Sequence, residues 1–176
     1  MCAEGGVFVR ILGIDPGYAI VGYGIVDAKG CNFSTVSYGA ITTCANTPFP
    51  ARLKSIYDDI CTIIEKYQPE ELSIERLYFN TNTTTAIDVA QARGVIVMAA
   101  HSRGLKINEY TPLQVKQAVT GYGKAEKHQV MEMVKSLLHL KNLPKPDDTA
   151  DALALALCHG HYTGSCYSKL YSEAIK

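Results

Sequence analysis

VFVRILGIDPG, residues 7–17, predicts a buried strand that ends in a sharp turn. Residues 7–15 are rich in the β-branched and aliphatic side chains that favour strands, and Pro16-Gly17 stops the strand. Residues 19–27 and 32–43 predict two further strands, separated by a turn at Lys29-Gly30. Because the connections are short, these three strands are expected to form an antiparallel meander.

The rest of the chain alternates between helical and strand patterns. Apolar residues at helical spacing end near Tyr67-Gln68-Pro69, and residues 72–75 then form a short strand. The segments expected after it are a helix to about residue 101, a strand at 106–110, and helices at 112–120, 126–140 and 148–159. A right-handed crossover would lay the fourth strand parallel to the first, on its free edge. The prediction is an α/β fold with a mixed five-stranded sheet, order 3-2-1-4-5, flanked by helices.

Length and composition indicate one globular domain. The chain has 176 residues, of which 47% are hydrophobic and 19% charged, so it has the composition of a compact protein. The longest apolar run, residues 152–158, is far shorter than the roughly 20 residues that span a bilayer. With no secretory pattern at its start, the chain is expected to be cytoplasmic, without a membrane partner. Residues 1–161 form the expected folded domain, and residues 162–176 a C-terminal tail of weak periodicity.

The net charge is zero, but the charges are unevenly distributed along the sequence. Residues 76–145 contain 10 Lys and Arg against 4 Asp and Glu, whereas residues 1–75 contain 5 against 9. Residues 146–176 contain 2 against 4. This pattern suits an enzyme that grips a polyanion and also holds cations, although solvated helix charge is the simpler interpretation.

Four carboxylates are expected to meet at one end of the sheet. Asp15 and Glu75 end neighbouring parallel strands, about 5 Å apart across the ladder. Asp148 and Asp151 share a face at the start of the last helix and join them if that helix packs on the first strand. Four such acids need divalent cations, and oxygen ligands select Mg²⁺ or Mn²⁺. Taken singly, each acid could instead be a turn residue, a helix cap or a strand-end charge.

Several motifs in this order resemble the RuvC family of Holliday-junction resolvases. They are Gly13-Ile14-Asp15-Pro16-Gly17, Ile74-Glu75, Gln91-Ala92-Arg93-Gly94, Gln114-Val115-Lys116, the run GYGKAEK at 121–127, and DTADALA at 148–154. The resemblance covers about residues 7–161. It implies a ribonuclease H-like fold and metal-dependent cleavage of four-way DNA junctions by paired symmetric nicks, in recombination and DNA repair. It also implies Mg²⁺, with Mn²⁺ as a substitute and two ions per site, a homodimer, and a branch-migration motor of the RuvA and RuvB type as partner.

The resemblance also assigns residues to roles. The metal-binding and catalytic acids of the family fall on Asp15, Glu75, Asp148 and Asp151. The family's DNA-contacting lysines match Lys116 and Lys127. The other expected DNA-binding residues are Lys124, in the basic glycine hinge between these two lysines, and Tyr78, Phe79 and Arg76. Tyr78 matches the aromatic residue that stacks at the junction. Phe79 follows it directly, and Arg76 stands where many relatives carry a neutral residue.

Three other functions compete with this prediction. The first is a ribonuclease H-like nuclease that acts on another branched or hybrid nucleic acid. The second is a nucleotide-binding domain of the actin and sugar-kinase type, whose phosphate loop resembles residues 13–17. Such proteins need two lobes, and this chain is long enough for one. The third is a DNA-binding module without catalysis, which would have no need of four acids.

Overall fold

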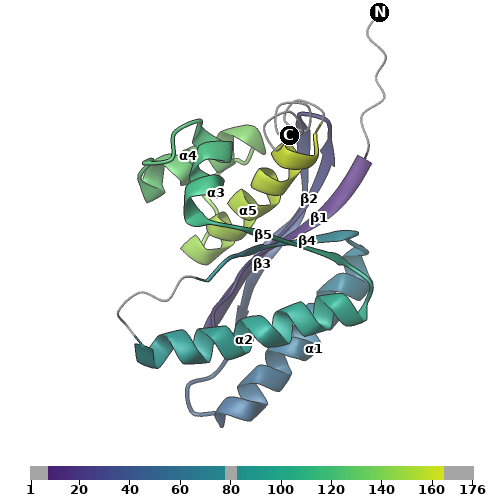
Figure 1. Cartoon of the computed structure of the whole chain (residues 1–176), viewed down its shortest axis with the longest axis vertical. Helices are drawn as coiled ribbons and strands as arrows, with labels where there is room; N and C mark the ends of the chain where they lie inside the picture. Colours follow the sequence, from purple (N-terminus) through teal and green to yellow (C-terminus); the bar gives the residue numbers. More distant parts are fainter. Residues whose placement is uncertain (1–7, 78–82, 165–176) are drawn as a thin grey trace, which may run out of the picture.

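The computed structural model describes residues 8–77 and 83–164. It has a central sheet with helices on both faces (Figure 1). The strands are β1 (Phe8–Asp15), β2 (Ile20–Lys29), β3 (Asn32–Thr42), β4 (Glu71–Glu75) and β5 (Lys106–Tyr110). The helices are α1 (Phe49–Tyr67), α2 (Thr83–Ser102), α3 (Pro112–Thr120), α4 (Lys127–Leu137) and α5 (Asp147–Thr163). No helix within the described ranges is long and apolar enough to cross a membrane.

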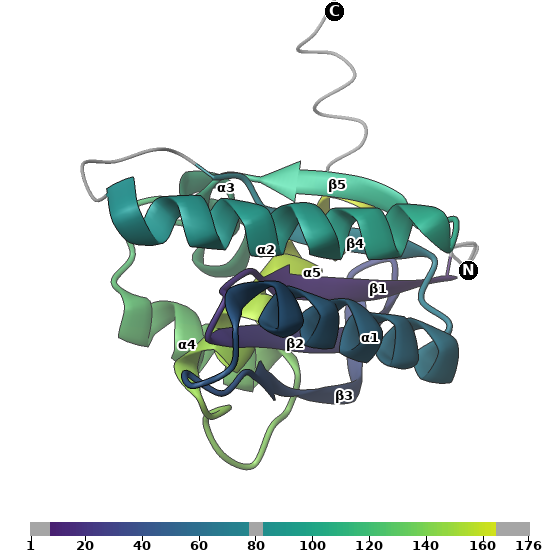
Figure 2. The same cartoon turned by 90° about the horizontal axis from the view of Figure 1, so that it is seen from below.

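The strand order is β3-β2-β1-β4-β5, which confirms the predicted order. β1, β2 and β3 pair antiparallel, and β4 pairs in parallel with both β1 and β5. The crossover through α1 brings β4 to the free edge of β1, and the crossover through α2 brings β5 to the free edge of β4, as Figure 2 shows from the side of these helices. The meander and the two parallel strands therefore share one sheet, with β1 in its middle.

Each face of the sheet has its own hydrophobic core, and β1 contributes to both. Leu12 and Ile14 pack with α1 and α2 in one core, whereas Val9 and Ile11 pack with α4 and α5 in the other. Alternate side chains of a strand point to opposite faces, so a strand covered on both sides must be apolar throughout. This explains the nearly continuous apolar run that marks β1 in the sequence.

α5 lies unusually close to the sheet because two glycines leave room for its backbone. A Cβ atom on Gly13 would stand 2.0 Å from the carbonyl oxygen of Ala152, and one on Gly22 would stand 2.0 Å from that of Asp148. Neither position accepts a side chain without moving the helix. The first turns of α5 are thereby seated directly on β1 and β2.

Buried polar bonds hold the rest of α5 in place. Ser73 Oγ donates a hydrogen bond of 2.7 Å to the carbonyl of Leu155. Burial lowers the pKa of His159. Its neutral ring accepts from the Tyr110 hydroxyl at Nδ1 and donates to Glu71 from Nε2, both at 2.6 Å. These bonds fix α5 against β4 and β5.

Several helix boundaries differ from the expected ones. α1 begins at Phe49, where Pro48 and Pro50 favour a helix start that an apolar-spacing argument overlooks. α4 ends at Leu137, and His139 just after it has a φ of 51°, in the left-handed region. α5 extends through Thr163, so that Tyr162 stacks on Tyr110 with ring centroids 5.2 Å apart.

Candidate active site

Asp15 and Glu75 stand side by side at the carboxyl ends of β1 and β4. The parallel register pairs Ile14 with Ile74, and the two acids are the next residue in each strand. Both strands end here because the chain turns away at Pro16 and beyond Glu75. The carboxyl ends of parallel strands are where open α/β sheets bind ligands. This placement agrees with the sequence-based expectation.

α5 brings two more acids to the same end of the sheet. Asp15 pairs with Gly22 across the antiparallel ladder, and the backbone of Asp148 lies against Gly22. Asp151 is almost one helical turn further on, over the strand that carries Asp15. The condition for the acids to meet, that α5 packs on β1, is therefore fulfilled.

Burial and the charges of neighbouring acids perturb three of the four carboxylates. Burial, followed by the charges of Asp151, Glu75 and Asp148, raises the pKa of Asp15 from 3.8 to about 7. Burial also raises the pKa of Glu75, with a smaller contribution from Asp151. The pKa of Asp151 is raised by burial despite its hydrogen bond to Lys127. The cluster therefore needs a compensating positive charge to remain ionised near neutral pH.

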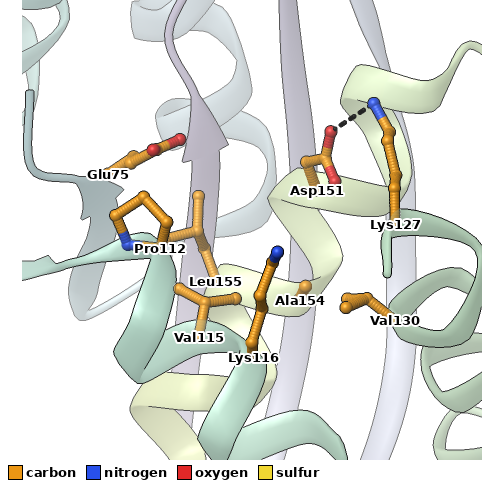
Figure 3. A pocket seen from close by; sticks show the side chains of 9 residues that line it. All are labelled: Glu75, Pro112, Val115, Lys116, Lys127, Val130, Asp151, Ala154 and Leu155. Atoms are coloured by element: carbon orange, nitrogen blue, oxygen red, sulfur yellow. Dashed lines mark ion pairs between the residues drawn. The ribbon is translucent and has the colours of Figure 1, made fainter. Parts of the chain in front are cut away.

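Lys127 supplies part of that positive charge. Its Nζ lies 3.0 Å from Asp151 Oδ2 and 3.5 Å from Asp147 Oδ2 (Figure 3). Burial by itself would lower the pKa of Lys127, but the hydrogen bond and the two carboxylates raise it. The first residue of α4 is thus tied to the first turns of α5.

A cavity of about 270 Å³ opens between these acids and the helices α3 and α4. Figure 3 shows Glu75 and Asp151 on opposite sides of it, with the Lys116 and Lys127 ammonium groups between and beside them. Its remaining walls are apolar: Pro112, Val115, Val130, Ala154 and Leu155. The two ammonium groups are placed to neutralise a phosphodiester in this cavity, whereas the two carboxylates would repel it unless cations neutralised them.

The donor set fits a hard divalent cation. All four side chains are carboxylates, and their mutual repulsion is of the kind that such an ion relieves. Among the residues that the structure describes, however, no three acidic, His or Cys side chains are grouped closely enough to hold one ion. The backbone positions thus favour a metal site, and the side chains must turn toward one another to complete it.

Comparison with known proteins identifies the family. The model of "Crossover junction endodeoxyribonuclease RuvC" matches residues 11–159. The chain belongs to the RuvC family. Relatives of that name from Brevibacillus brevis and Alkaliphilus metalliredigens are 56% and 59% identical to it. Their matches cover 88% and 86% of this chain, and 93% and 92% of theirs.

Solved structures agree with this assignment. Thermus thermophilus RuvC in complex with Holliday junction substrate is 33% identical to the chain, with a TM-score of 0.85. That match covers 90% of this chain and 97% of the other. The yeast mitochondrial Holliday junction resolvase Ydc2 is 16% identical, with a TM-score of 0.67, and shares the fold. The RuvC fold is ribonuclease H-like, as the sequence predicted.

The structure brings some of the expected DNA-binding residues to the cavity and leaves others elsewhere. Lys116 and Lys127 line it, whereas Lys124 is exposed in the connection between α3 and α4. Arg76 is exposed just after β4, and its backbone N–H donates to the carbonyl of Tyr110. Tyr78 and Phe79 lie outside the described residues.

Two residues near the acids had no role in the sequence-based prediction. Asp147 shares the Lys127 ammonium with Asp151. Arg93 of α2 donates a hydrogen bond to the backbone carbonyl of Glu75. A sequence signal existed for Arg93, because it is the one Lys or Arg in the sequence of α2. Asp147 is indistinguishable in sequence from an ordinary acid in a first helical turn.

The raised pKa of Asp15 predicts how its removal alters stability. Folding raises the pKa of Asp15 from 3.8 to about 7, so an ionised Asp15 lowers the free energy of unfolding. This destabilisation is absent below about pH 4, where the group is protonated in both states. It grows between about pH 4 and about pH 7 and is constant above that. We expect Asp15→Asn to raise the Tm in EDTA at pH 8, by about 2–4 °C per kcal/mol of repulsion removed, and by less at pH 5.

Calorimetry at the two pH values checks this expectation. Asp58→Asn is the matched control, since Asp58 is an exposed acid of α1 paired with Lys54. It should not stabilise the protein at pH 8. An Asp15→Asn variant that melts at or below the wild-type temperature at pH 8 would show that Asp15 is not held in a repulsive cluster.

Proposed function

We propose that the protein is an endonuclease that resolves four-way DNA (Holliday) junctions by metal-dependent hydrolysis of phosphodiester bonds, in recombination and DNA repair. The observation that carries the proposal is the carboxylate cluster at the ends of β1 and β4, which adjoins a cavity lined by two lysines. Membership of the RuvC family supports the substrate class. A ribonuclease H-like nuclease acting on another nucleic acid is the second candidate.

Asp15, Glu75, Asp148 and Asp151 are the proposed ligands of Mg²⁺, or of Mn²⁺ in its place, with two ions per site. When bound, such a pair activates water for attack and stabilises the leaving oxygen. The four carboxylates would fix the position of the cations, and the apolar walls of the cavity limit the access of bulk water. At Asp148 a neutral ligand could serve, so this position is expected to be the most tolerant of change.

Lys127 has two successive partners in this proposal. Before substrate binds, its ammonium neutralises Asp151 and Asp147. With cations held by these carboxylates, the Lys127 ammonium would be free to contact the scissile phosphate, beside Lys116. The remaining proposed DNA contacts are Lys124, Arg76, Tyr78 and Phe79, with one aromatic ring stacking on an unpaired base at the crossover.

The proposed assembly is a homodimer with one active site for each of two symmetric nicks. A two-fold symmetric junction is most simply cut by a protein with the same symmetry. α2 offers a surface for this contact, because Ile87 and Met98 are 57% and 60% exposed. The proposed further partner is a branch-migration motor of the RuvA and RuvB type, in the cytoplasm.

Lys116 is expected to contribute to the salt dependence of junction binding. A lysine that neutralises one phosphate releases about one counterion, so Lys116→Ala should reduce the slope of log K against log salt by about one unit. Binding is measured in EDTA by fluorescence anisotropy of a labelled junction between about 50 and 200 mM salt, a range over which the affinity of a protein with several phosphate contacts falls by orders of magnitude. Lys54→Ala, on the far face in α1, is the control. An unchanged slope for Lys116→Ala would assign Lys116 to the solvated surface.

The function itself is tested on three substrates. The purified protein is incubated with a labelled four-way junction, a duplex of the same sequence and an RNA–DNA hybrid, each with Mg²⁺ or EDTA. Paired nicks in the junction alone, dependent on Mg²⁺, are expected. Preferred cleavage of the hybrid would favour the second candidate, and cleavage in EDTA would contradict metal-dependent hydrolysis.

A further inference from the structure

The end of β4 is held by a side chain from a different layer of the protein. Arg93 Nε, on α2, donates a hydrogen bond of 3.0 Å to the backbone carbonyl of Glu75. The same guanidinium forms an ion pair through Nη2 with Glu109 of β5. The Arg93 side chain is only 17% exposed. One planar side chain therefore connects α2, β4 and β5 next to the carboxylate cluster, where Figure 2 shows α2 running along these two strands.

This contact lies at the point where Glu75 is paired with a neighbouring strand on one side only. The ladder between β1 and β4 ends at the pair of Ile14 with Ile74, one residue before Glu75. On the other side, the N–H of Arg76 donates to the carbonyl of Tyr110 at 2.8 Å, so β5 still holds the strand. Arg93 supplies the bond to the Glu75 carbonyl at this point, and it thereby limits rotation of the peptide that carries the acid.

We propose that Arg93 is a positioning residue that orients Glu75 for cation binding. The inference rests on the proposed function, because it takes Glu75 as a metal ligand. Arg93 bonds the backbone carbonyl and not the carboxylate, so it leaves both carboxylate oxygens available to a cation. Groups that orient the ligands of a metal in this way typically change its affinity 10–100-fold when they are lost.

A simple stabilising ion pair is the alternative role. Glu109 is 43% exposed, and ion pairs of exposed carboxylates contribute little to stability. A lysine could reach one partner, but it lacks the planar fork with which Arg93 bonds both at once. A positioning role and a stabilising role therefore differ in what Arg93→Gln changes: metal affinity in the first, melting temperature alone in the second.

The experiment compares Arg93→Gln, Arg93→Lys and the control Arg103→Gln in the full-length protein. Arg103 pairs with Glu65 at 2.6 Å, just after the end of α2, and has no bond to Glu75. Two quantities are measured: the Mg²⁺ concentration for half-maximal single-turnover junction cleavage, and Mn²⁺ binding to the protein without DNA, followed by the EPR signal of free Mn²⁺. Arg93→Gln should raise the Mg²⁺ midpoint and weaken Mn²⁺ binding by about tenfold or more. Arg93→Lys should recover part of the loss, and Arg103→Gln should stay within about twofold of wild type, since it touches no proposed ligand.

A wild-type Mg²⁺ midpoint and Mn²⁺ affinity in folded Arg93→Gln would overturn the inference, even if the Tm falls. If Arg93→Gln does not fold, Arg93→Met decides in its place, because methionine has no N–H to donate to the Glu75 carbonyl, and wild-type values for it would overturn the inference in the same way. Glu75→Gln separates this inference from the proposed function. Full cleavage by Glu75→Gln would contradict the proposed active site itself. An inactive Glu75→Gln together with wild-type metal affinity in Arg93→Gln would contradict only the role of Arg93.

Discussion

Asp15→Asn is expected to stop junction cleavage while junction affinity stays close to that of the wild type. Asp15 is the most strongly perturbed of the four acids, and the charges of the other three all act on it. Loss of this carboxylate removes a proposed metal ligand from the cluster, and a loss of several kcal/mol of transition-state stabilisation corresponds to a rate loss of about 1000-fold or more. The lysines proposed to contact the DNA backbone are unchanged, so junction binding is expected to be retained.

Single-turnover cleavage in Mg²⁺ and gel-shift binding in EDTA measure the two effects separately. Glu75→Gln and Asp151→Asn should behave like Asp15→Asn, and Asp148→Asn should lose least. Asp58→Asn, at the exposed ion pair of α1, serves as the matched control and should cut like the wild type. Cleavage by Asp15→Asn at the wild-type rate would show that the cluster is not the catalytic site.

Gly22→Ala is expected to damage both stability and cleavage. The added Cβ would stand 2.0 Å from the carbonyl oxygen of Asp148 and 3.0 Å from the amide nitrogen of Thr149, both in the backbone of α5. Neither atom can swing aside as a flexible side chain can, so the first turn of α5 must move away from β2. Overpacking of this kind costs about 1–3 kcal/mol, and a displacement near 1 Å at a catalytic group can cost about 100-fold in rate.

The effect is measured as Tm and as single-turnover cleavage in the same preparations. Gly39→Ala is the control within the sheet, since the nearest atoms to its Cβ would belong to the Tyr23 side chain, at 3.0 Å, and not to the backbone. It should lose little of either property. A Gly22→Ala protein with wild-type cleavage would mean that the seat of α5 on β2 does not position Asp148.

The arrangement of the backbone could be predicted from the sequence because it follows from local patterns. The apolar run of β1, the short turns after it and the helical spacing of α1 determine the strand order β3-β2-β1-β4-β5 by general rules of connection. Once β1 and β4 are parallel neighbours, Asp15 and Glu75 must lie together at one edge. Docking of α5 then completes the cluster. Gly13 and Gly22, which leave room for that helix, are present in the sequences of β1 and β2.

The side-chain partners could not be predicted in this way. Lys127 was expected to contact DNA, and in the structure it pairs with Asp151 and Asp147, which come from another helix. The bond from Arg93 to the Glu75 carbonyl likewise joins residues that are 18 positions apart and lie in different layers. Such contacts depend on where two elements cross and on side-chain length, and no periodic pattern records either of them.

The most direct test of the central claim is the anomalous scattering of a crystal of the wild-type protein soaked in Mn²⁺. The account predicts anomalous peaks within ligand distance, about 2.0–2.2 Å, of the carboxylate oxygens of Asp15, Glu75, Asp148 and Asp151. In that crystal Lys127 should have released Asp151. Anomalous peaks elsewhere, or none at this cluster while Mn²⁺ supports cleavage in solution, would contradict it.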